Sequence, residues 1–397
     1  RPRMTTPDLT LNARPARLAW GLLFSVATLM LVSLAFVHSS TLGDTSTTLK
    51  QGVWFGVGLA AAVAICFVDY HILARWAWVG YWAAIVLLVL VFFIGAYRNG
   101  ARRWIELGPI QFQPSEFAKL AVVLALGQFL SRPIEELRLT NVVAKTLALV
   151  LLPFLLILKE PDLGSAIVLI PTMFAMMFVA GVPVRILGRI LAGAGLIAGL
   201  LVADVLFAPE KFQLLKLKEY QRQRLLVYFG KDFAPPNATP EQRAYYRELQ
   251  RQKGWNVQQA LISVGSGGLT GKGWREGTQN ALGYLPRLGA HNDFIFSVIA
   301  EETGFAGSVV VVVLYTVILF SGLKIAGQAR DRLGRLLATG VVSLWFAHIF
   351  INIGMNIGLM PVTGIPLPLL SYGGSAAVSA VLAISLLQNV YIYRKSY

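Results

Sequence analysis

Asp293 is the side chain with the clearest chemical potential, and it stands in the run HNDFIFSVIAEETGFAG at 291–307. A carboxylate of this kind can act as a general base when a reacting hydroxyl lies within hydrogen-bond reach. A simpler interpretation also fits, because Asp is a favoured N-cap for a helix that begins at Phe294. Glu301 and Glu302 follow in the same run and are expected to be hydrogen-bond partners between helices. Spacing alone leaves both roles of Asp293 open.

Glu116 and Lys119 form a second candidate, three residues apart at the start of an apolar stretch. This spacing places both side chains on one helix face, within reach of each other. A charge at the centre of a membrane span costs roughly 2.5–3.5 kcal/mol, so such residues are functional candidates. The alternative is a self-neutralising pair near a helix start, where the helix dipole favours the glutamate. The two interpretations are compatible.

Arginines gather beside a tryptophan upstream of this pair and again in the basic segment 211–228. The first group is typical of an anchor at the membrane interface, but it also suits an anionic ligand. The second lies in a segment whose apolar residues predict an amphipathic helix at the membrane surface. The candidates to bind an anion are Arg98, Arg102, Arg103, Trp104, Arg222 and Arg224.

Other common sites receive little support. The glycine cluster at 265–273 could hold phosphate through backbone N–H groups, but its spacing is better explained by a turn. One cysteine and four scattered histidines exclude Cys/His metal sites. The net charge of +15 lies largely in loops beside apolar segments, where cations set topology and meet anionic lipid. Nucleic acid is therefore not an expected partner.

The elements that must position these residues are membrane helices. Of 397 residues, 56% are hydrophobic and 14% are charged, whereas soluble domains carry roughly 25% charged residues. A span needs about 20 apolar residues, which predicts a single all-α, polytopic domain over 1–397 with ten transmembrane helices. The predicted spans are 18–38, 52–68, 76–97, 117–131, 142–158, 165–181, 186–207, 307–325, 336–360 and 371–393.

The sidedness follows from the Lys and Arg residues beside the spans. An inside N-terminus gives 16 such residues on the inner side against 5 in the short outer connections. We therefore expect a cytoplasmic tail at 1–17, both termini inside, and an extracytoplasmic loop at 208–306 between helices seven and eight. Residues 231–253 of this loop are predicted to be turn-rich and then a polar helix. These patterns fit an enzyme for a lipid-linked anion, a flippase for one, or a scaffold.

Several longer motifs occur in order along the chain, and together they resemble the SEDS family (shape, elongation, division and sporulation). The resemblance spans about residues 20–393, with a long insert near 231–253 as its main departure. The segment PVTGIP at 361–366 is similar to the elongation branch. The motifs are RRWIELGPIQFQPSEFAKL at 102–120, EPDLGSA at 160–166, YQRQRLLVYF at 220–229, ALISVGSGGLTGKG at 260–273, HNDFIFSVIAEETGFAG at 291–307 and MPVTGIPLPLLSYGGS at 360–375.

The resemblance implies a peptidoglycan glycosyltransferase of the bacterial inner membrane. Such an enzyme polymerises lipid II outside the cytoplasm and releases polyprenyl pyrophosphate, in cell-wall elongation and rod-shape maintenance. The implied partners are a class B penicillin-binding protein and other membrane proteins of the elongation machinery. The family's essential carboxylate maps onto Asp293, its fourth-helix motif onto Glu116 and Lys119, and its outer-loop tryptophan onto Trp104.

The implied chemistry gives each candidate a role. Asp293 would be the general base, and the cations would stabilise the departing pyrophosphate. A divalent cation, Mg²⁺ or Mn²⁺, could accompany the pyrophosphate, and no organic cofactor is expected. The alternatives that stay open are a lipid II flippase and a membrane scaffold of the elongation machinery.

Overall fold

Helices make up most of the computed structural model, which describes residues 18–98, 101–108, 110–207, 219–231, 233, 239–285 and 289–394. Within these ranges, nine helical segments are long and apolar enough to cross a membrane. They are α1 (Trp20–Ser40), α2 (Thr45–Cys66), α4 (Ala77–Ile94), α7 (Thr140–Lys159), α8 (Leu163–Ile167) with α9 (Leu169–Ala180), α10 (Val184–Phe207), α14 (Ile295–Gln328), α15 (Arg332–Asn356) and α16 (Gly374–Tyr393). The prediction of a helical, multi-span membrane protein is confirmed.

The fourth predicted span, 117–131, forms helix α5 (Pro114–Leu130) but is not one of these nine. Its 17 residues measure about 26 Å, which is less than the roughly 30 Å of a bilayer core. Its first turn is polar, and Pro114 at the first position suits a helix start. The predicted count of ten spans is therefore not confirmed. Helix α5 is largely buried and contacts α4, α7, α9, α15 and α16.

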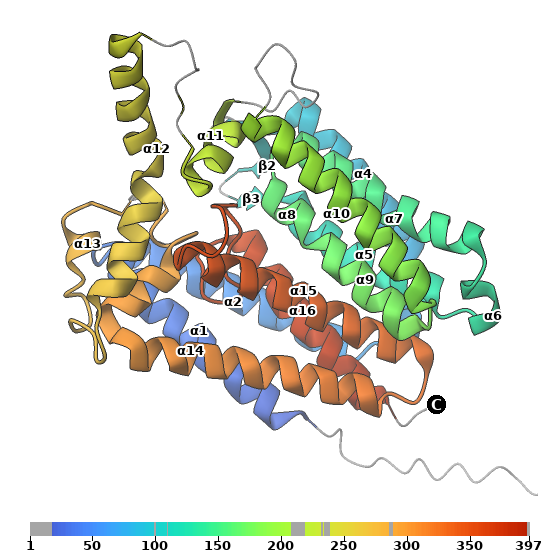
Figure 1. Cartoon of the computed structure of the whole chain (residues 1–397). Helices are drawn as coiled ribbons and strands as arrows, with labels where there is room; N and C mark the ends of the chain where they lie inside the picture. Colours follow the sequence, from blue (N-terminus) through green and yellow to red (C-terminus); the bar gives the residue numbers. More distant parts are fainter. Residues whose placement is uncertain are drawn as a thin grey trace, which may run out of the picture.

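Helices α15 and α16 lie at the centre of the molecule (Figure 1). Helix α2 packs along α16, α14 packs against both α1 and α15, and α9 packs against α15. Most residues of α15 are buried, whereas few residues of α10 are. The interior therefore forms around α5, α15 and α16, and any polar group on these helices must find its partners inside the protein.

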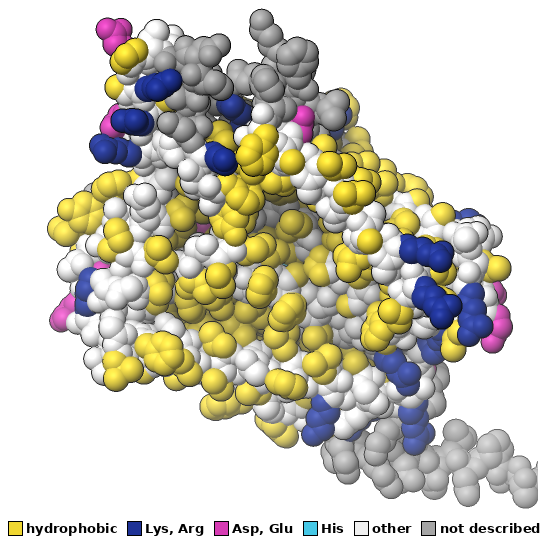
Figure 2. Space-filling model, viewed as in Figure 1, with side chains coloured by type: hydrophobic (Ala, Val, Ile, Leu, Met, Phe, Trp, Pro, Cys, Tyr) yellow, Lys and Arg dark blue, Asp and Glu magenta, His cyan; other side chains and the backbone are white. Residues whose placement is uncertain are grey.

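The two ends of the bundle differ in structure. The short helix α6 (Ile134–Leu137), the connection from α14 to α15 and the C-terminus lie at one end (Figure 1). The strands and the helices of the long loop lie at the other. Figure 2 shows hydrophobic side chains over the middle of the molecule, with Lys and Arg gathered near α6 and on the loop. This distribution is that of a protein with a lipid-facing middle.

A small antiparallel sheet at the loop end was not predicted. Its strands are β1 (Ala96–Arg98), β2 (Ala101–Leu107) and β3 (Ile110–Phe112), in that order. The span predicted at 76–97 therefore ends early, because the chain becomes extended at Gly95. Ala96 pairs with Trp104, and Ile105 pairs with Phe112. The first group of arginines lies on this sheet, whose last strand leads into the start of α5.

The long loop contains three further helices, α11 (Glu219–Tyr228), α12 (Pro240–Ser266) and α13 (Thr278–Ala281). The predicted amphipathic helix at 211–228 is seen only as α11, since its first part lies outside the described residues. Helix α11 packs against α12, and Tyr228 donates a hydrogen bond to the Leu359 carbonyl at 2.9 Å. The polar helix expected within 231–253 is the first part of α12, which projects from the bundle (Figure 1). A capping box between Thr239 and Gln242 begins it.

Helix α14 begins at Ile295, well before the predicted span at 307–325. At Gly304 the backbone leaves the helical region, with φ +68° and ψ −161°. The break lets the glycine segment at 267–273 pack directly on the helix, where the N–H groups of Phe305 and Ala306 bond to Gly268 and Leu269. Part of the glycine cluster is therefore a closely packed turn.

Replacing Gly304 with Ala should lower stability, because a Cβ there would lie 2.3 Å from the Gly271 nitrogen at a positive φ. We expect a loss of about 2 kcal/mol or more. Gly265→Ala is the matched control, since a Cβ at Gly265 meets nothing within 4 Å. Thermal unfolding in detergent measures both variants. Equal midpoints for the two would contradict this account of the break.

Candidate functional site

Asp293 lies in a turn just before α14, and its backbone is tied to α15. The Asp293 carbonyl accepts hydrogen bonds from the side-chain amides of Asn352 at 3.2 Å and Asn356 at 3.1 Å. The helix begins at Ile295 with Phe294 as its N-cap, and no side chain caps it. The interpretation of Asp293 as the N-cap of a helix from Phe294 is therefore wrong.

The segment between α15 and α16 lies against this turn. Asn352 also donates to the Ile365 carbonyl at 2.7 Å, while Ser371 donates to the Asn292 carbonyl at 2.6 Å. Gly364 has φ +75°, and a Cβ built on it would lie 3.5 Å from Asp293 Oδ2. The carboxylate of Asp293 thus lies beside a position that has no side chain. Two loops far apart in the sequence meet here and are joined by hydrogen bonds.

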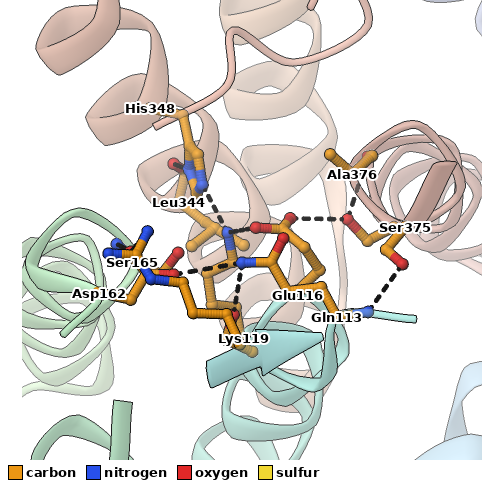
Figure 3. Close-up of polar contacts among 12 residues, drawn as sticks. Gln113, Glu116, Lys119, Asp162, Ser165, Leu344, His348, Ser375 and Ala376 are labelled. Atoms are coloured by element: carbon orange, nitrogen blue, oxygen red, sulfur yellow. Dashed lines mark hydrogen bonds and ion pairs between the residues drawn. The ribbon is translucent and has the colours of Figure 1, made fainter. Parts of the chain in front are cut away.

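Glu116 and Lys119 form a buried cluster with residues of α15 and α16 (Figure 3). Lys119 Nζ is 2.7 Å from Glu116 Oε1 and 2.7 Å from His348 Nε2. Ser379 donates a hydrogen bond to Glu116 Oε2 at 3.1 Å. Glu116 is 4% exposed and Lys119 is 2% exposed. The predicted pairing is confirmed, and it is a buried pair rather than a surface one.

A pocket opens beside this cluster. Its polar lining comes from Glu116, Lys119, His348 and Ser379. Pro366 and Pro368 line it from the segment that also carries Gly364. The pocket therefore lies between the buried ion pair and the segment that contacts Asp293.

The arginines of the sheet have identifiable contacts. Arg103 donates to the Glu160 carbonyl at 3.3 Å and to the Pro161 carbonyl, and it lies 3.9 Å from an Asp162 oxygen. Arg102 is exposed and donates to the Phe92 carbonyl at 3.0 Å. Both guanidinium groups lie at the loop end of the bundle, at the ends of α4 and α7. Backbone carbonyls hold both groups at this end.

The other candidate cations and Trp104 are less closely tied to the cluster. Trp104 is half-buried in β2 opposite Ala96, and Arg222 is half-buried in α11. The side chains of Arg98 and Arg224 lie outside the described residues. Of the predicted site residues, the structure brings Glu116 and Lys119 into contact, and α15 connects them with Asp293.

Gln113 extends the network from the start of α5. Its side-chain amide donates to Asp162 at 3.2 Å, and its backbone N–H donates to Ser375 at 2.9 Å (Figure 3). Asp162 in turn caps α8 by accepting from the Ser165 N–H at 3.1 Å. Two of these residues, Gln113 and Asp162, thus join the arginine-bearing sheet to the interior helices.

Glu301 and Glu302 hold the loop end of the structure together, as predicted. Glu301 pairs with Lys272 at 2.6 Å and accepts from the Gln279 N–H at 3.0 Å. Glu302 accepts from the Arg275 N–H at 3.0 Å and from Ser39. These contacts fix the segment 272–279 to α14 and α1. The geometry of these contacts indicates that Glu301 and Glu302 position the loop.

Sequence reasoning missed the polar residues of α15. His348, Asn352 and Asn356 are each four residues apart and are all buried, so they share one helix face. This face reaches from Lys119 to the Asp293 turn. A signal was present, because polar groups inside a span are costly unless they are paired or functional. Ser379 on α16 is another polar residue inside a span that sequence reasoning missed.

Glu160 is a further buried carboxyl group, at the end of α7. It is 1% exposed, and neither of its side-chain oxygens has a hydrogen-bond partner among the described residues. Burial, reinforced by the Asp162 charge, raises the pKa of Glu160 to about 9, and Arg103 only partly opposes this. The group is therefore protonated at neutral pH.

Comparisons with known proteins agree with this architecture. The family model described as "Cell cycle protein", for FtsW, RodA and SpoVE, matches residues 14–396. The chain is 34% identical to peptidoglycan glycosyltransferase MrdB of Escherichia coli K12, over 94% of this chain and 93% of that one. It is 30% identical to peptidoglycan glycosyltransferase RodA of Treponema pallidum, over 93% and 96% of the two chains.

Solved structures show the same fold. One, reported as the structural coordination of polymerization and crosslinking by a peptidoglycan synthase complex, is 31% identical with a TM-score of 0.77. It covers 96% of this chain and 99% of that chain. The rod shape determining protein RodA of Thermus thermophilus is 28% identical with a TM-score of 0.65, over 95% and 98% of the chains.

The raised pKa of Glu160 predicts a pH-dependent stability. The ordinary pKa is 4.5 and the folded value is about 9, so between these values the unfolded chain releases a proton that the folded chain keeps. The free energy of unfolding should therefore fall as pH rises from 4.5 towards 9, by at most about 3 kcal/mol at pH 7. Glu160→Gln should remove this dependence and unfold at a higher temperature at pH 8.

Thermal unfolding of the wild type and of Glu160→Gln at pH 5 and pH 8 measures this effect. Glu248→Gln, an exposed carboxyl on α12, is the control and should leave the dependence unchanged. The same slope with pH in wild type and Glu160→Gln would contradict the assignment.

Proposed function

This chain belongs to the FtsW/RodA/SpoVE family of cell cycle proteins, the SEDS family, and from that premise we propose how its site works. It is a peptidoglycan glycosyltransferase of cell-wall elongation. We propose that Asp293 is its general base and that lipid II is its substrate. One observation supports this most: two buried amides hold the Asp293 turn, while its carboxylate lies beside Gly364.

In the proposed reaction, the 4-hydroxyl of one sugar attacks the anomeric carbon of another. The new bond is the glycosidic C–O bond, and the bond between the anomeric carbon and the pyrophosphate oxygen breaks. Asp293 takes the hydroxyl proton, which requires hydrogen-bond reach of about 3 Å. Because the backbone of Asp293 is fixed, its carboxylate can be aimed without ordering the loop at each turnover.

The leaving pyrophosphate needs positive charge where its own negative charge develops. Lys119 is the best-fixed candidate, because Glu116 and His348 hold its ammonium group beside the pocket. Arg102 and Arg103 are candidates at the outer rim, with Trp104 beside them for stacking against a sugar. Further candidates for this anion are Arg98, Arg222 and Arg224.

The described residues do not fit a resident metal site. Among them, no three His, Cys, Asp or Glu side chains are grouped so that they could hold a metal ion. A divalent cation such as Mg²⁺ or Mn²⁺ would take most of its ligands from the substrate pyrophosphate, as Mg²⁺ commonly does. No step of the proposed reaction is assigned to it.

The chain is a multi-span membrane protein, and we propose that its loop end faces outward from the bacterial inner membrane, with both termini in the cytoplasm. The count of Lys and Arg in the short connections supports this orientation. As partners we propose a class B penicillin-binding protein and other membrane proteins of the elongation machinery. The similarity to a peptidoglycan synthase complex that couples polymerization to crosslinking supports the first.

Asp293→Asn should abolish glycan polymerisation, because the amide cannot accept the hydroxyl proton. We expect the rate to fall by at least about 100-fold. The assay follows lipid II consumption and polyprenyl pyrophosphate release by purified protein. Glu248→Gln on the projecting helix α12 is the matched control and should polymerise normally.

Two outcomes oppose this assignment. Normal glycan chains from folded Asp293→Asn protein would remove Asp293 as the base. Movement of labelled lipid II across liposomes without release of polyprenyl pyrophosphate would instead support a flippase.

A further inference from the structure

The imidazole of His348 is held in one tautomer. His348 is 5% exposed, in the middle of α15, and its Nδ1 lies 2.8 Å from the Leu344 carbonyl. A carbonyl oxygen only accepts hydrogen bonds, so the ring proton belongs on Nδ1. Nε2 therefore carries a lone pair, and it points at Lys119. If both ring nitrogens were protonated, the N–H donor at Nε2 would face the ammonium group of Lys119, which is also a donor.

The ammonium group of Lys119 has three N–H donors, and among the described residues it has two acceptors. These are His348 Nε2 and Glu116 Oε1, each at 2.7 Å. The other oxygen of Glu116 accepts from Ser379, so the carboxylate is itself fixed. One N–H of Lys119 remains for a ligand in the pocket that the lysine lines.

His348 also connects this lysine to the Asp293 turn. Asn352, one helical turn further along the same face, holds the Ile365 carbonyl and the Asp293 carbonyl. Pro366, next to Ile365, lines the pocket together with Lys119. One face of α15 therefore sets the position of the cation and of the proposed base together.

We propose that His348 is a positioning residue for glycan polymerisation. Its neutral ring accepts a hydrogen bond from Lys119 and fixes the ammonium group beside the pocket, where the leaving pyrophosphate requires positive charge. A lysine side chain is flexible and carries its charge as a point, so it needs a second acceptor to hold one direction. This inference rests on the proposed function and adds to it a residue that acts through Lys119.

The test compares two substitutions that differ mainly in reach. The amide oxygen of Gln in His348→Gln can reach Lys119, whereas the shorter amide in His348→Asn cannot. We expect His348→Gln to keep kcat for lipid II polymerisation within about threefold, and His348→Asn to lower kcat about tenfold with KM within about twofold. A role in folding alone would lower the yield of folded protein without separating kcat from KM.

Equal kcat values for the two variants would overturn the proposal. So would loss of folding in both, because the proposal requires an acceptor for Lys119 rather than an imidazole.

A second measurement is independent of the substrate. Thermal unfolding of Lys119→Met, His348→Asn and the double variant should give a double-variant shift clearly smaller than the sum of the single shifts. His71→Asn is the control, since the His71 ring lies 3.3 Å from Asp331, which caps the start of α15; its shift should add to that of Lys119→Met without coupling. Additive shifts for the 119–348 pair would overturn the contact. Normal polymerisation by Asp293→Asn would instead overturn the proposed base. The coupling between the Lys119 and His348 substitutions would then still test the contact between these two residues.

Discussion

The buried ion pair between Lys119 and Glu116 constrains the helices around it. Two charges inside an apolar bundle are tolerated only when their geometry is good and their other hydrogen-bonding groups are satisfied. Here α5 supplies both charges, α15 supplies His348 and α16 supplies Ser379. A shift of α15 or α16 relative to α5 would remove the hydrogen bond that His348 or Ser379 makes with the pair. The pair therefore fixes their relative positions, and those helices form the walls of the pocket.

The loops at the site are held in place by hydrogen bonds for a related reason. The turn before α14 and the segment between α15 and α16 have irregular backbones, whose polar groups cannot be left unpaired in the interior. The side-chain amides of Asn352 and Asn356 satisfy these groups by donating hydrogen bonds to the carbonyls of Asp293 and Ile365. The same amides that satisfy the backbone also fix the proposed base. Stability and pre-organisation of the site thus come from the same contacts.

Local pattern predicted the helices and the pairing of Glu116 with Lys119, because both depend on residues close in the sequence. It did not predict the short sheet at 96–112, whose strands follow a helix directly and are only a few residues long. It also left Asp293 undecided between cap and base. The structure excludes the cap, because the helix begins at Ile295 with Phe294 as its N-cap. The Asp293 turn is held by Asn352 and Asn356, about sixty residues away. His348 was missed because its role depends on a contact with Lys119, which lies 229 positions away in the sequence.

The most direct test of the account is a structure of the Asp293→Asn protein with lipid II bound in both sugar positions. The account predicts the attacking 4-hydroxyl within about 3 Å of the side chain at position 293. It also predicts the pyrophosphate on the side of Lys119. A substrate complex in which the acceptor hydroxyl lies against another carboxylate, with position 293 facing away, would contradict the central claim.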